Sequence, residues 1–159
     1  MAILGARRRR RFEIGIFSQG KIIPDATVDG EHRQSVPLES VPENIPAQDI
    51  DGPVLFAGLA PVPFGHVILN SLGRLWALEH LPSETKLLYV LLNKQSTGAP
   101  HLRPVLDLLG IENEVVFLNS ARTCSRVFTA ADLFSEGTKG HVAPDYLTWL
   151  QKRLPPKGQ

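Results

Sequence analysis

Three polar residues at helical spacing are the strongest candidates for chemistry in this sequence. His66, Asn70 and Arg74 follow one another at steps of four, which places them on one face of a helix. A neutral histidine near a helix start can accept a proton from a hydroxyl group, as general-base catalysis requires. An arginine on the same face can pair with a phosphate or a carboxylate. The same spacing is also typical of an ordinary solvated helix face, and spacing alone does not decide between the two interpretations.

Two glycines flank the segment that leads into the predicted helix. Gly58 lies in the apolar run 54–60, and Gly65 directly precedes His66. A strand, a glycine-containing loop and a helix start place backbone N–H groups and the positive end of a helix dipole at the carboxyl edge of a sheet, where ligands of open α/β sheets bind. We therefore expect Gly58 and Gly65 to line a binding loop, although they form no Gly-x-Gly-x-x-Gly or Gly-Lys-Ser/Thr phosphate fingerprint.

The remaining candidates have structural interpretations. Cys124 is expected to be a buried or inert thiol, and Trp76 lies within the apolar arc of the predicted helix and is expected in the core. Asp132 and Glu136 form either an acid pair or part of a turn after a strand, and the turn is the simpler account. Four scattered histidines lack the spacing of metal ligands: His32, His80, His101 and His141. We expect neither a metal nor a cofactor.

The elements that position these residues alternate along the chain. Apolar runs predict strands at 54–60, 86–92, 114–118 and 125–133. Helical periodicity and stop signals predict helices from His66 to about His80, from 100 to 109 and from 145 to 154. Strands alternating with helices are typical of crossover units on a parallel sheet. We predict an α/β fold with a mainly parallel sheet and helices on both faces.

Composition divides the chain into three parts. Residues 1–11 include the unbroken run Arg7–Arg11 and are expected to form a solvated basic tail, although such a run could also bind nucleic acid or an anionic membrane. Residues 12–52 comprise a short alternating strand and a proline-rich extended lead-in. Residues 53–159 carry the strand–helix pattern. Without Arg7–Arg11, Lys plus Arg falls from 17 to 12 against 16 Asp plus Glu, so the body has a net charge of −4.

Length and overall composition exclude several protein classes. The 159 residues are 43% hydrophobic and 21% charged, which is typical of one globular domain and excludes global disorder and fibrous repeats. The single cysteine excludes an internal disulfide framework and a multi-cysteine zinc site. No apolar run approaches the roughly 20 residues of a membrane span, and no secretory signal is visible. We expect a soluble, cytoplasmic protein.

The segment around the candidate helix resembles a known family. Residues 52–58 (Gly-Pro-Val-Leu-Phe-Ala-Gly) and 64–78 (Phe-Gly-His-Val-Ile-Leu-Asn-Ser-Leu-Gly-Arg-Leu-Trp-Ala-Leu) are similar to the amino-terminal motif of family 61 glycosyltransferases, many of which are called capsular polysaccharide biosynthesis proteins. Residues 108–111 and 144–150 also fit this pattern. The resemblance covers roughly residues 52 to 154, with the Gly-His helix as its specific element. The family has Glu or Asp where this chain has Asn70.

The resemblance implies a fold and an activity. The fold would be a Rossmann-like, mainly parallel sheet like the amino-terminal half of a GT-B-type glycosyltransferase, with residues 53–159 as that half-domain. The activity would be transfer of a sugar from a nucleotide-sugar to a carbohydrate or lipid-linked acceptor, with inversion at the anomeric carbon. His66 would deprotonate the acceptor hydroxyl, Arg74 would position an anionic group, and Asn70 would stand at the position of the family's acid.

The resemblance also implies an incomplete site. The family's second half would begin near the last residue of this sequence, so we expect a partial or truncated enzyme that lacks turnover alone and that binds its missing half or itself. Nucleotide-sugar donor and glycan acceptor are the expected partners, with no nucleic acid and no integral membrane segment. The alternative is a non-catalytic binding or interaction domain left by truncation. A neighbouring reading frame that encodes the second half would favour the enzyme.

Overall fold

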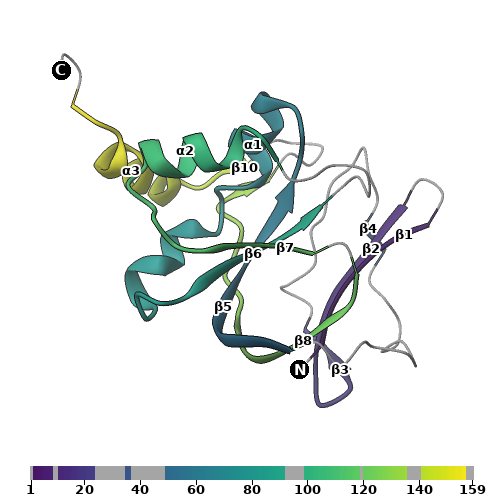
Figure 1. Ribbon diagram of the computed structural model, residues 1–159. Coiled ribbons are helices and arrows are strands. Elements are labelled where there is room, and N and C mark those ends of the chain that lie inside the picture. Colours follow the sequence, from purple (N-terminus) through teal and green to yellow (C-terminus); the bar gives the residue numbers. More distant parts are fainter. Residues whose placement is uncertain are drawn as a thin grey trace.

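The computed structural model describes residues 2–8, 11–23, 35–36, 49–91, 99–118, 120–135 and 141–156 (Figure 1). Its strands are β1 (Ala2–Arg8), β2 (Arg11–Ser18), β3 (Lys21–Ile22), β4 (Ser35–Val36), β5 (Asp49–Ala60), β6 (Lys86–Leu91), β7 (Val115–Leu118), β8 (Arg122–Phe128), β9 (Phe134–Ser135) and β10 (His141–Val142). Its helices are α1 (Phe64–Asn70), the 3-10 helix η2 (Leu75–His80), α2 (Leu102–Leu108) and α3 (Pro144–Arg153). The chain is therefore a mixed α/β protein.

The centre of the protein is a set of parallel strands. Within the described residues, the main sheet has the order β3-β2-β1-β8-β5-β6-β7, and β4 pairs with β2. The neighbours β8, β5, β6 and β7 are all parallel, whereas β1, β2 and β3 pair in antiparallel fashion. The four predicted strands correspond to β5, β6, β7 and β8. The prediction of a parallel sheet is confirmed for these four strands.

The order of the parallel strands is compatible with a Rossmann-like α/β fold. With β5 counted first, the order β7-β6-β5-β8 is 3-2-1-4, as in the first part of a dinucleotide-binding sheet. The link between β7 and β8 departs from that pattern. It consists of residues 119–121, which is far shorter than the helical crossover that normally joins parallel strands.

Side-chain alternation along β5 and β6 buries both faces of the parallel strands. Leu55, Ala57, Leu87 and Tyr89 join one core cluster, and the residues between them join a second cluster. The first cluster includes residues of α1, α2 and α3: Val67, Leu102, Leu106, Tyr146 and Trp149. The second cluster is closed by Ile16 of β2 and by Ile23.

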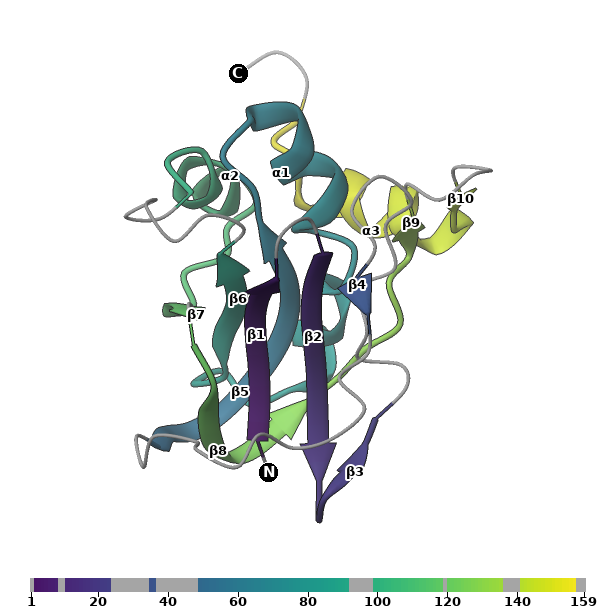
Figure 2. The same ribbon diagram turned by 90° about the vertical axis from the view of Figure 1, so that its right-hand side faces the viewer.

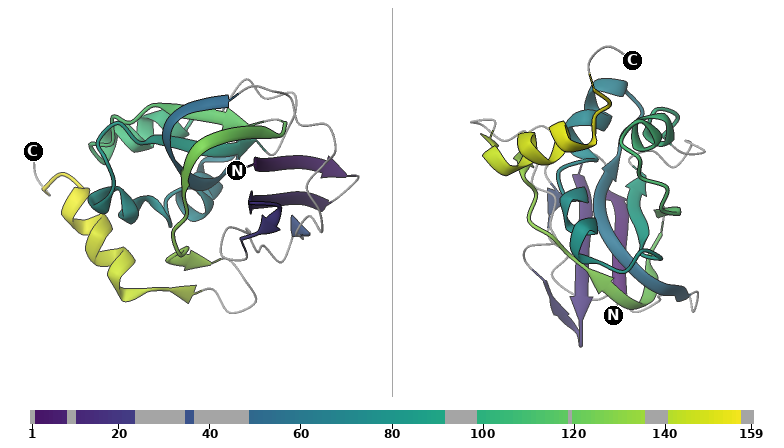
Figure 3. Two further views of the ribbon diagram at one scale, coloured as in Figure 1. Left: turned by 90° about the horizontal axis from the view of Figure 1, so that it is seen from below. Right: turned by 90° about the vertical axis from the view of Figure 1, so that its left-hand side faces the viewer.

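The prediction of helices on both faces is therefore wrong for the described residues. All described helices that enter the core pack on one face of the parallel strands, and the β1–β2 hairpin covers the other face. Figures 2 and 3 show this division, with β1 and β2 on one side of β5 and β6. The hairpin is also joined to the main sheet, because Ala2 and Ile3 of β1 pair with the edge of β8.

The amino-terminal segment differs from the predicted basic tail. β1 and β2 form an antiparallel hairpin in which Arg7 pairs with Phe12 and Arg8 with Arg11. The prediction weighed like-charge repulsion alone, whereas the backbone ladder with the alternating segment of β2 holds this part of the chain as a strand. Of the predicted proline-rich lead-in, residues 24–34 and 37–48 lie outside the described residues.

Candidate functional site

The sequence between β5 and α1 sets where the helix begins. β5 ends at Ala60, and Pro63 takes the extended N-cap position of α1 with φ −68° and ψ 134°. Proline has no N–H group and a fixed φ, so this segment cannot continue the strand ladder. The amide of Val67 donates to the carbonyl of Pro63 at 3.2 Å, which closes the first turn. His66 therefore lies in the first turn of α1, just after the carboxyl end of β5.

His66 and Asn70 form a hydrogen-bonded pair on α1. His66 is exposed, Asn70 is partly exposed, and Asn70 Nδ2 lies 3.4 Å from His66 Nδ1. With the amide nitrogen donating, His66 Nδ1 is the acceptor and Nε2 carries the ring proton. With the amide group turned over, Nδ1–H donates to the Asn70 carbonyl oxygen and Nε2 becomes the basic nitrogen. The Asn70 side chain can thus select the tautomer of His66.

The predicted helix from His66 to His80 is interrupted, and this moves Arg74 away from the predicted face. α1 ends at Asn70, and η2 begins at Leu75. The break is held by tertiary hydrogen bonds of Ser71. Its hydroxyl donates to the carbonyl of Leu59 at 2.7 Å, and its carbonyl accepts from the hydroxyl of Tyr89 at 2.8 Å. These bonds turn the chain inward because they fix Ser71, the residue that follows the last residue of α1, against β5 and β6.

Arg74 is buried and forms part of the core. Its side chain is 3% exposed, and Nη1 donates to Asp132 Oδ2 at 2.9 Å. Nε donates to the carbonyl of Ala130 at 3.2 Å, and the guanidinium lies 5.4 Å from the ring centre of Phe56. The prediction that Arg74 shares an exposed face with His66 is wrong. Its carboxylate partner comes from the same chain.

The Arg74–Asp132 pair belongs to a larger contact that we call the clasp, formed by Gly73, Arg74 and Trp76 with residues 130–134. The carbonyl of Gly73 accepts from the amide of Leu133 at 3.0 Å, and Trp76 Nε1 donates to the carbonyl of Ala131 at 3.1 Å. Asp132 Oδ1 accepts from the amide of Phe134 at 3.2 Å. The clasp fixes the segment after β8 beside the turn that follows α1.

Burial controls the protonation equilibria in the clasp. It lowers the pKa of the Arg74 guanidinium, and the Asp132 carboxylate opposes this shift. It raises the pKa of the Asp132 carboxyl, and the opposing effects of Arg74 and the Phe134 amide are smaller. Arg74 remains a cation because its ordinary pKa lies far above neutral pH. Asp132, which is 25% exposed, supplies the compensating charge.

The two candidate glycines have different surroundings. Gly58 has φ +114°, and a Cβ there would lie 3.1 Å from the carbonyl oxygen of Asn70 and 3.3 Å from Arg74 Nη1. Glycine is required at this position by the close approach of the chain itself, so the expectation that Gly58 lines a binding loop is not supported. Gly65 is exposed, and a Cβ there would meet no atom within 4 Å. Gly65 thus leaves open space beside His66.

The structure brings together only part of the predicted site. His66 and Asn70 are paired, Gly65 adjoins His66, and Arg74 faces the interior. The sequence did not indicate that Asp132 is the partner of Arg74. A signal for it exists, because Asp132 is the sole charged residue within the stretch from Val127 to Ser135. Glu136, considered with it as an acid pair, lies outside the described residues.

Other potential ligand groups lie elsewhere. Asp49 and Asp51 form an Asp-x-Asp pattern at the start of β5, at the opposite end of that strand from α1. In the described part of the chain, no three or more His, Cys, Asp or Glu side chains gather in a way that could hold a metal ion. The Cys124 thiol is buried, as predicted. Trp76 is half-buried against the first core cluster, as its place in the apolar arc indicated.

The two tyrosines of the chain give a measurable test of the packing around this site. Burial, with a smaller effect of Asp132, raises the pKa of Tyr146 to about 12. Burial also raises the pKa of Tyr89 above its ordinary value. We expect no tyrosinate absorbance when the folded protein is taken to about pH 10, where an unfolded tyrosine titrates. Because folding favours the protonated phenols, the contribution of the two tyrosines to stability should be constant below about pH 10 and be lost above it.

Spectrophotometric titration of the native and the urea-unfolded protein checks this expectation. Tyr146→Phe leaves Tyr89 as the only phenol and separates the two contributions. A native titration midpoint at the unfolded value would contradict the described packing.

None of the helices among the described residues is both long enough and apolar enough to cross a membrane. No protein-family model, curated protein or solved structure matches this chain. The assignment of a function therefore depends on the residues of this site and their geometry.

Proposed function

We propose that this chain takes part in glycosyl transfer from a nucleotide-sugar to a carbohydrate or lipid-linked acceptor, with a site like that of family 61 glycosyltransferases. One observation carries the proposal: His66 is exposed in the first turn of α1, is paired with Asn70 and follows the carboxyl end of β5. In open α/β sheets, ligands gather at this end of the strands. In this proposal the parallel strands correspond to the amino-terminal, Rossmann-like half of a GT-B-type enzyme.

His66 and Asn70 have complementary roles in the proposed reaction. With the Asn70 amide group turned over, its carbonyl oxygen accepts the Nδ1–H of His66. The Nε2 of His66 then accepts the proton of the acceptor hydroxyl. The hydroxyl oxygen then forms a bond to the anomeric carbon as the bond to the nucleoside diphosphate breaks. This direct displacement inverts the anomeric centre, as the family resemblance implies. Gly65 leaves room for the acceptor beside the imidazole.

In this proposal Arg74 has a structural role and does not touch the substrate. Its guanidinium is held by Asp132 and Ala130, so it supports the turn after α1 and the segment after β8. The anion-binding contacts to the donor are assigned to the second Rossmann-like half that the resemblance implies. We therefore expect the 159-residue chain alone to bind acceptor saccharides without transferring sugar, since positioning of both substrates contributes up to roughly 7–11 kcal/mol.

Saccharide binding at His66 tests the proposal. Acceptor oligosaccharides are titrated into the labelled chain while the imidazole resonances of His66 are followed by NMR. We expect the His66 resonances to shift on binding and His66→Ala to abolish the interaction. His80→Ala, which removes another exposed histidine, is the matched control and should bind normally. Binding that leaves His66 unperturbed, or sugar transfer at an ordinary enzymatic rate by the chain alone, would contradict the proposal as stated.

A non-catalytic saccharide-binding or interaction domain is the second candidate. It is favoured by a specific observation: Arg74 and Gly58 serve the fold, and Asn70 stands where the family has an acid. Asn70→Asp discriminates between the two candidates. A carboxylate beside His66 would stabilise the imidazolium formed in general-base catalysis, so it should raise the transfer rate once the donor half is supplied. A pure binding domain would gain no activity.

A further inference from the structure

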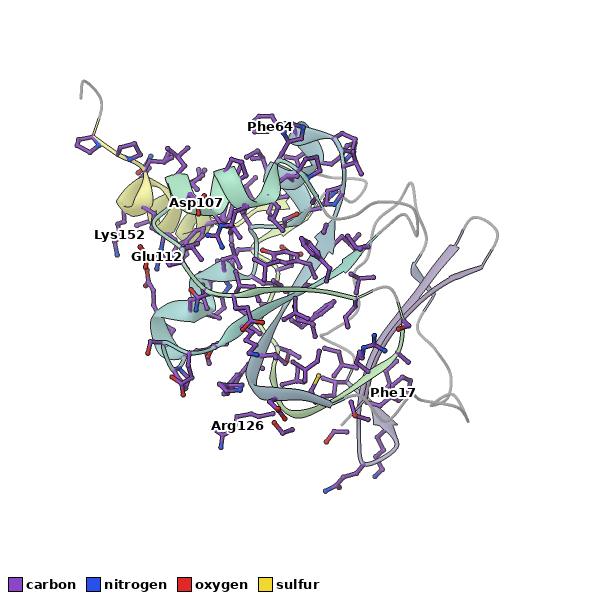
Figure 4. The ribbon with its side chains drawn as sticks, in the orientation of Figure 1. Phe17, Phe64, Asp107, Glu112, Arg126 and Lys152 are labelled. Carbon is purple, nitrogen blue, oxygen red and sulfur yellow. The ribbon has the colours of Figure 1, made fainter. Side chains whose placement is uncertain are left out.

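Two aromatic side chains from neighbouring strand–helix units meet at the end of the sheet that carries His66. Phe64 is the first residue of α1, which follows β5, and His101 is the N-cap residue of α2, which follows β6. Their rings lie edge to face, with centroids 5.8 Å apart and an interplanar angle of 85°. Figure 2 shows α1 and α2 next to each other beyond the ends of β5 and β6, and Figure 4 labels Phe64 at this end. Because β5 and β6 are parallel neighbours, the contact lies where ligands of open α/β sheets bind.

The contact between Phe64 and His101 is not part of the core. Phe64 is 56% exposed, more than any other exposed large hydrophobic residue in the described part of the chain, and His101 is exposed as well. His101 makes no side-chain cap hydrogen bond, although its position favours Ser, Thr, Asp or Asn, which cap a helix. Natural sequences break such local rules mainly at functional sites. The two rings are therefore candidates for contact with a ligand.

The surface beside Phe64 is open. All five residues from Val62 to His66 are exposed, and a Cβ at Gly65 would meet no atom within 4 Å. Phe64 and His66 both belong to the first turn of α1 and lie about 3 Å apart along the helix axis. A ligand that reaches His66 can therefore extend over the ring of Phe64.

The same surface carries no formal charge apart from its histidines. The sequence contains no Asp, Glu, Lys or Arg from Val54 to Gly73, nor from 99 to 102. The first charged residue after His101 is Arg103, whose Nε donates to Asp107 Oδ1 at 2.7 Å within α2. A nucleoside diphosphate would find no lysine or arginine in these segments to pair with its phosphates. The surface suits a neutral ligand with an apolar face and hydroxyl groups at its rim.

We propose that Phe64 and His101 form a subsite that stacks one pyranose ring of the acceptor saccharide. The C–H groups on one face of a pyranose carry partial positive charge and pack against the negative face of an aromatic ring. His101 holds the Phe64 ring edge to face, and its ring nitrogens are in place to exchange hydrogen bonds with sugar hydroxyls. This inference rests on the proposed function and adds to it the chemical class of the acceptor and its binding contact.

Helix geometry assigns the stacked ring to a particular sugar unit. Residues two positions apart on a helix do not face each other, so Phe64 and His66 point in different directions from α1. The ring on Phe64 is therefore the neighbour of the sugar unit whose hydroxyl reacts at His66. Acceptors with two or more sugar units should bind more tightly than monosaccharides, because only they can occupy both positions.

NMR titrations of the full chain test the subsite. The probes are the neutral disaccharides maltose, cellobiose, lactose, mannobiose and xylobiose, with their monosaccharides and with uridine diphosphate for comparison. We expect binding of at least one disaccharide, with transfer of saturation from the phenylalanine ring protons to the C–H protons of one sugar unit. Phe64→Ala should weaken this binding roughly two- to tenfold, which is the size of one aromatic contact, and Phe64→Tyr should retain it.

Three variants separate the subsite from general effects on the fold. Leu147→Ala shortens a side chain that is 51% exposed on α3 and should leave the affinity unchanged. His101→Phe keeps the ring contact with Phe64 and should retain more affinity than His101→Ala, which removes both the ring and its nitrogens. Circular dichroism of each variant verifies that the chain is folded, which we expect because Phe64, His101 and Leu147 are exposed.

Failure of the subsite and failure of the proposed function give different results. Binding that shifts the His66 resonances but is unchanged in Phe64→Ala overturns the subsite and leaves the proposed function intact. Binding that is weakened in Phe64→Ala but leaves His66 unperturbed supports the stacking contact and contradicts the proposed function. Equal losses for Phe64→Ala and Leu147→Ala, or tighter binding of uridine diphosphate than of any disaccharide, also overturn the subsite. The absence of binding to every saccharide contradicts both.

Discussion

Replacing Asp132 with asparagine will lower the free energy of unfolding by about 3 kcal/mol, the lower end of the range for breaking a buried ion pair. The reason is the buried guanidinium of Arg74, which is 3% exposed and lies 2.9 Å from Asp132 Oδ2. An amide at position 132 keeps the size of the side chain and can accept from the amide of Phe134, but it removes the compensating charge. Partial exposure of Asp132 keeps the effect at the lower end of the range.

Urea denaturation followed by circular dichroism measures this loss. Glu114→Gln is the matched control, because it makes the same chemical change in the exposed pair Lys86–Glu114, where the N–O distance is 3.1 Å and Glu114 is 62% exposed. That pair should contribute less than about 1 kcal/mol. Joint replacement by Arg74→Met and Asp132→Leu should recover much of the stability, since it leaves no buried charge unpaired. Similar losses for Asp132→Asn and Glu114→Gln would show that the Arg74–Asp132 pair stabilises the fold no more than an exposed ion pair does.

The parallel strands were predictable because the lengths of their apolar runs, the residues that flank them and their burial all favour a strand. Continuous apolar runs of strand length, ended by proline, glycine or polar residues, indicated β5, β6 and β7 to within a few residues. β6 and the carboxyl-terminal half of β5 are largely buried and β7 is partly buried, so burial and strand propensity favour the same structure. α2 and α3 were predicted for the same reason, since their apolar spacing and end signals coincide.

The interruption of the first helix was not predictable from its own residues. The apolar spacing of residues 66–80 fits one continuous helix, and no proline or obligatory turn residue marks a break at Ser71. The break depends on Leu59 and Tyr89, which bond to the hydroxyl and the carbonyl of Ser71. Those partners are distant in sequence, and a local pattern carries no information about them. Tertiary hydrogen bonds thus override helical periodicity at this position.

The separation of partners along the sequence also explains which part of the candidate site could be predicted. His66 and Asn70 are four residues apart within one short helix, so their pairing follows from helix geometry. Arg74 and Asp132 are 58 positions apart, and their pairing depends on how β8 is placed beside β5. The hairpin of β1 and β2 was missed because the expected repulsion among arginines was weighed without the pairing partner.

A glycine provides the second strong test of the clasp. An ideal Cβ at Gly73 would lie 1.9 Å from Asp132 Oδ1 and 3.3 Å from the amide nitrogen of Phe134. The Asp132 side chain cannot easily move away, because Arg74 and Phe134 hold both of its oxygens. Gly73→Ala should therefore lower the free energy of unfolding by about 1–3 kcal/mol, through overpacking and displacement of Asp132.

Gly65→Ala is the matched control, because it adds the same methyl group in α1 where no atom lies within 4 Å. Alanine is the better helix former, so this variant should be neutral or more stable by up to about 1 kcal/mol. Combining Gly73→Ala with Asp132→Asn tests the mechanism further. If the methyl group acts by displacing Asp132, the double variant should lose less stability than the sum of the two single losses. Additive losses would instead mean that Gly73 and the Arg74–Asp132 pair stabilise the fold independently of each other, and that the methyl group does not act by displacing Asp132.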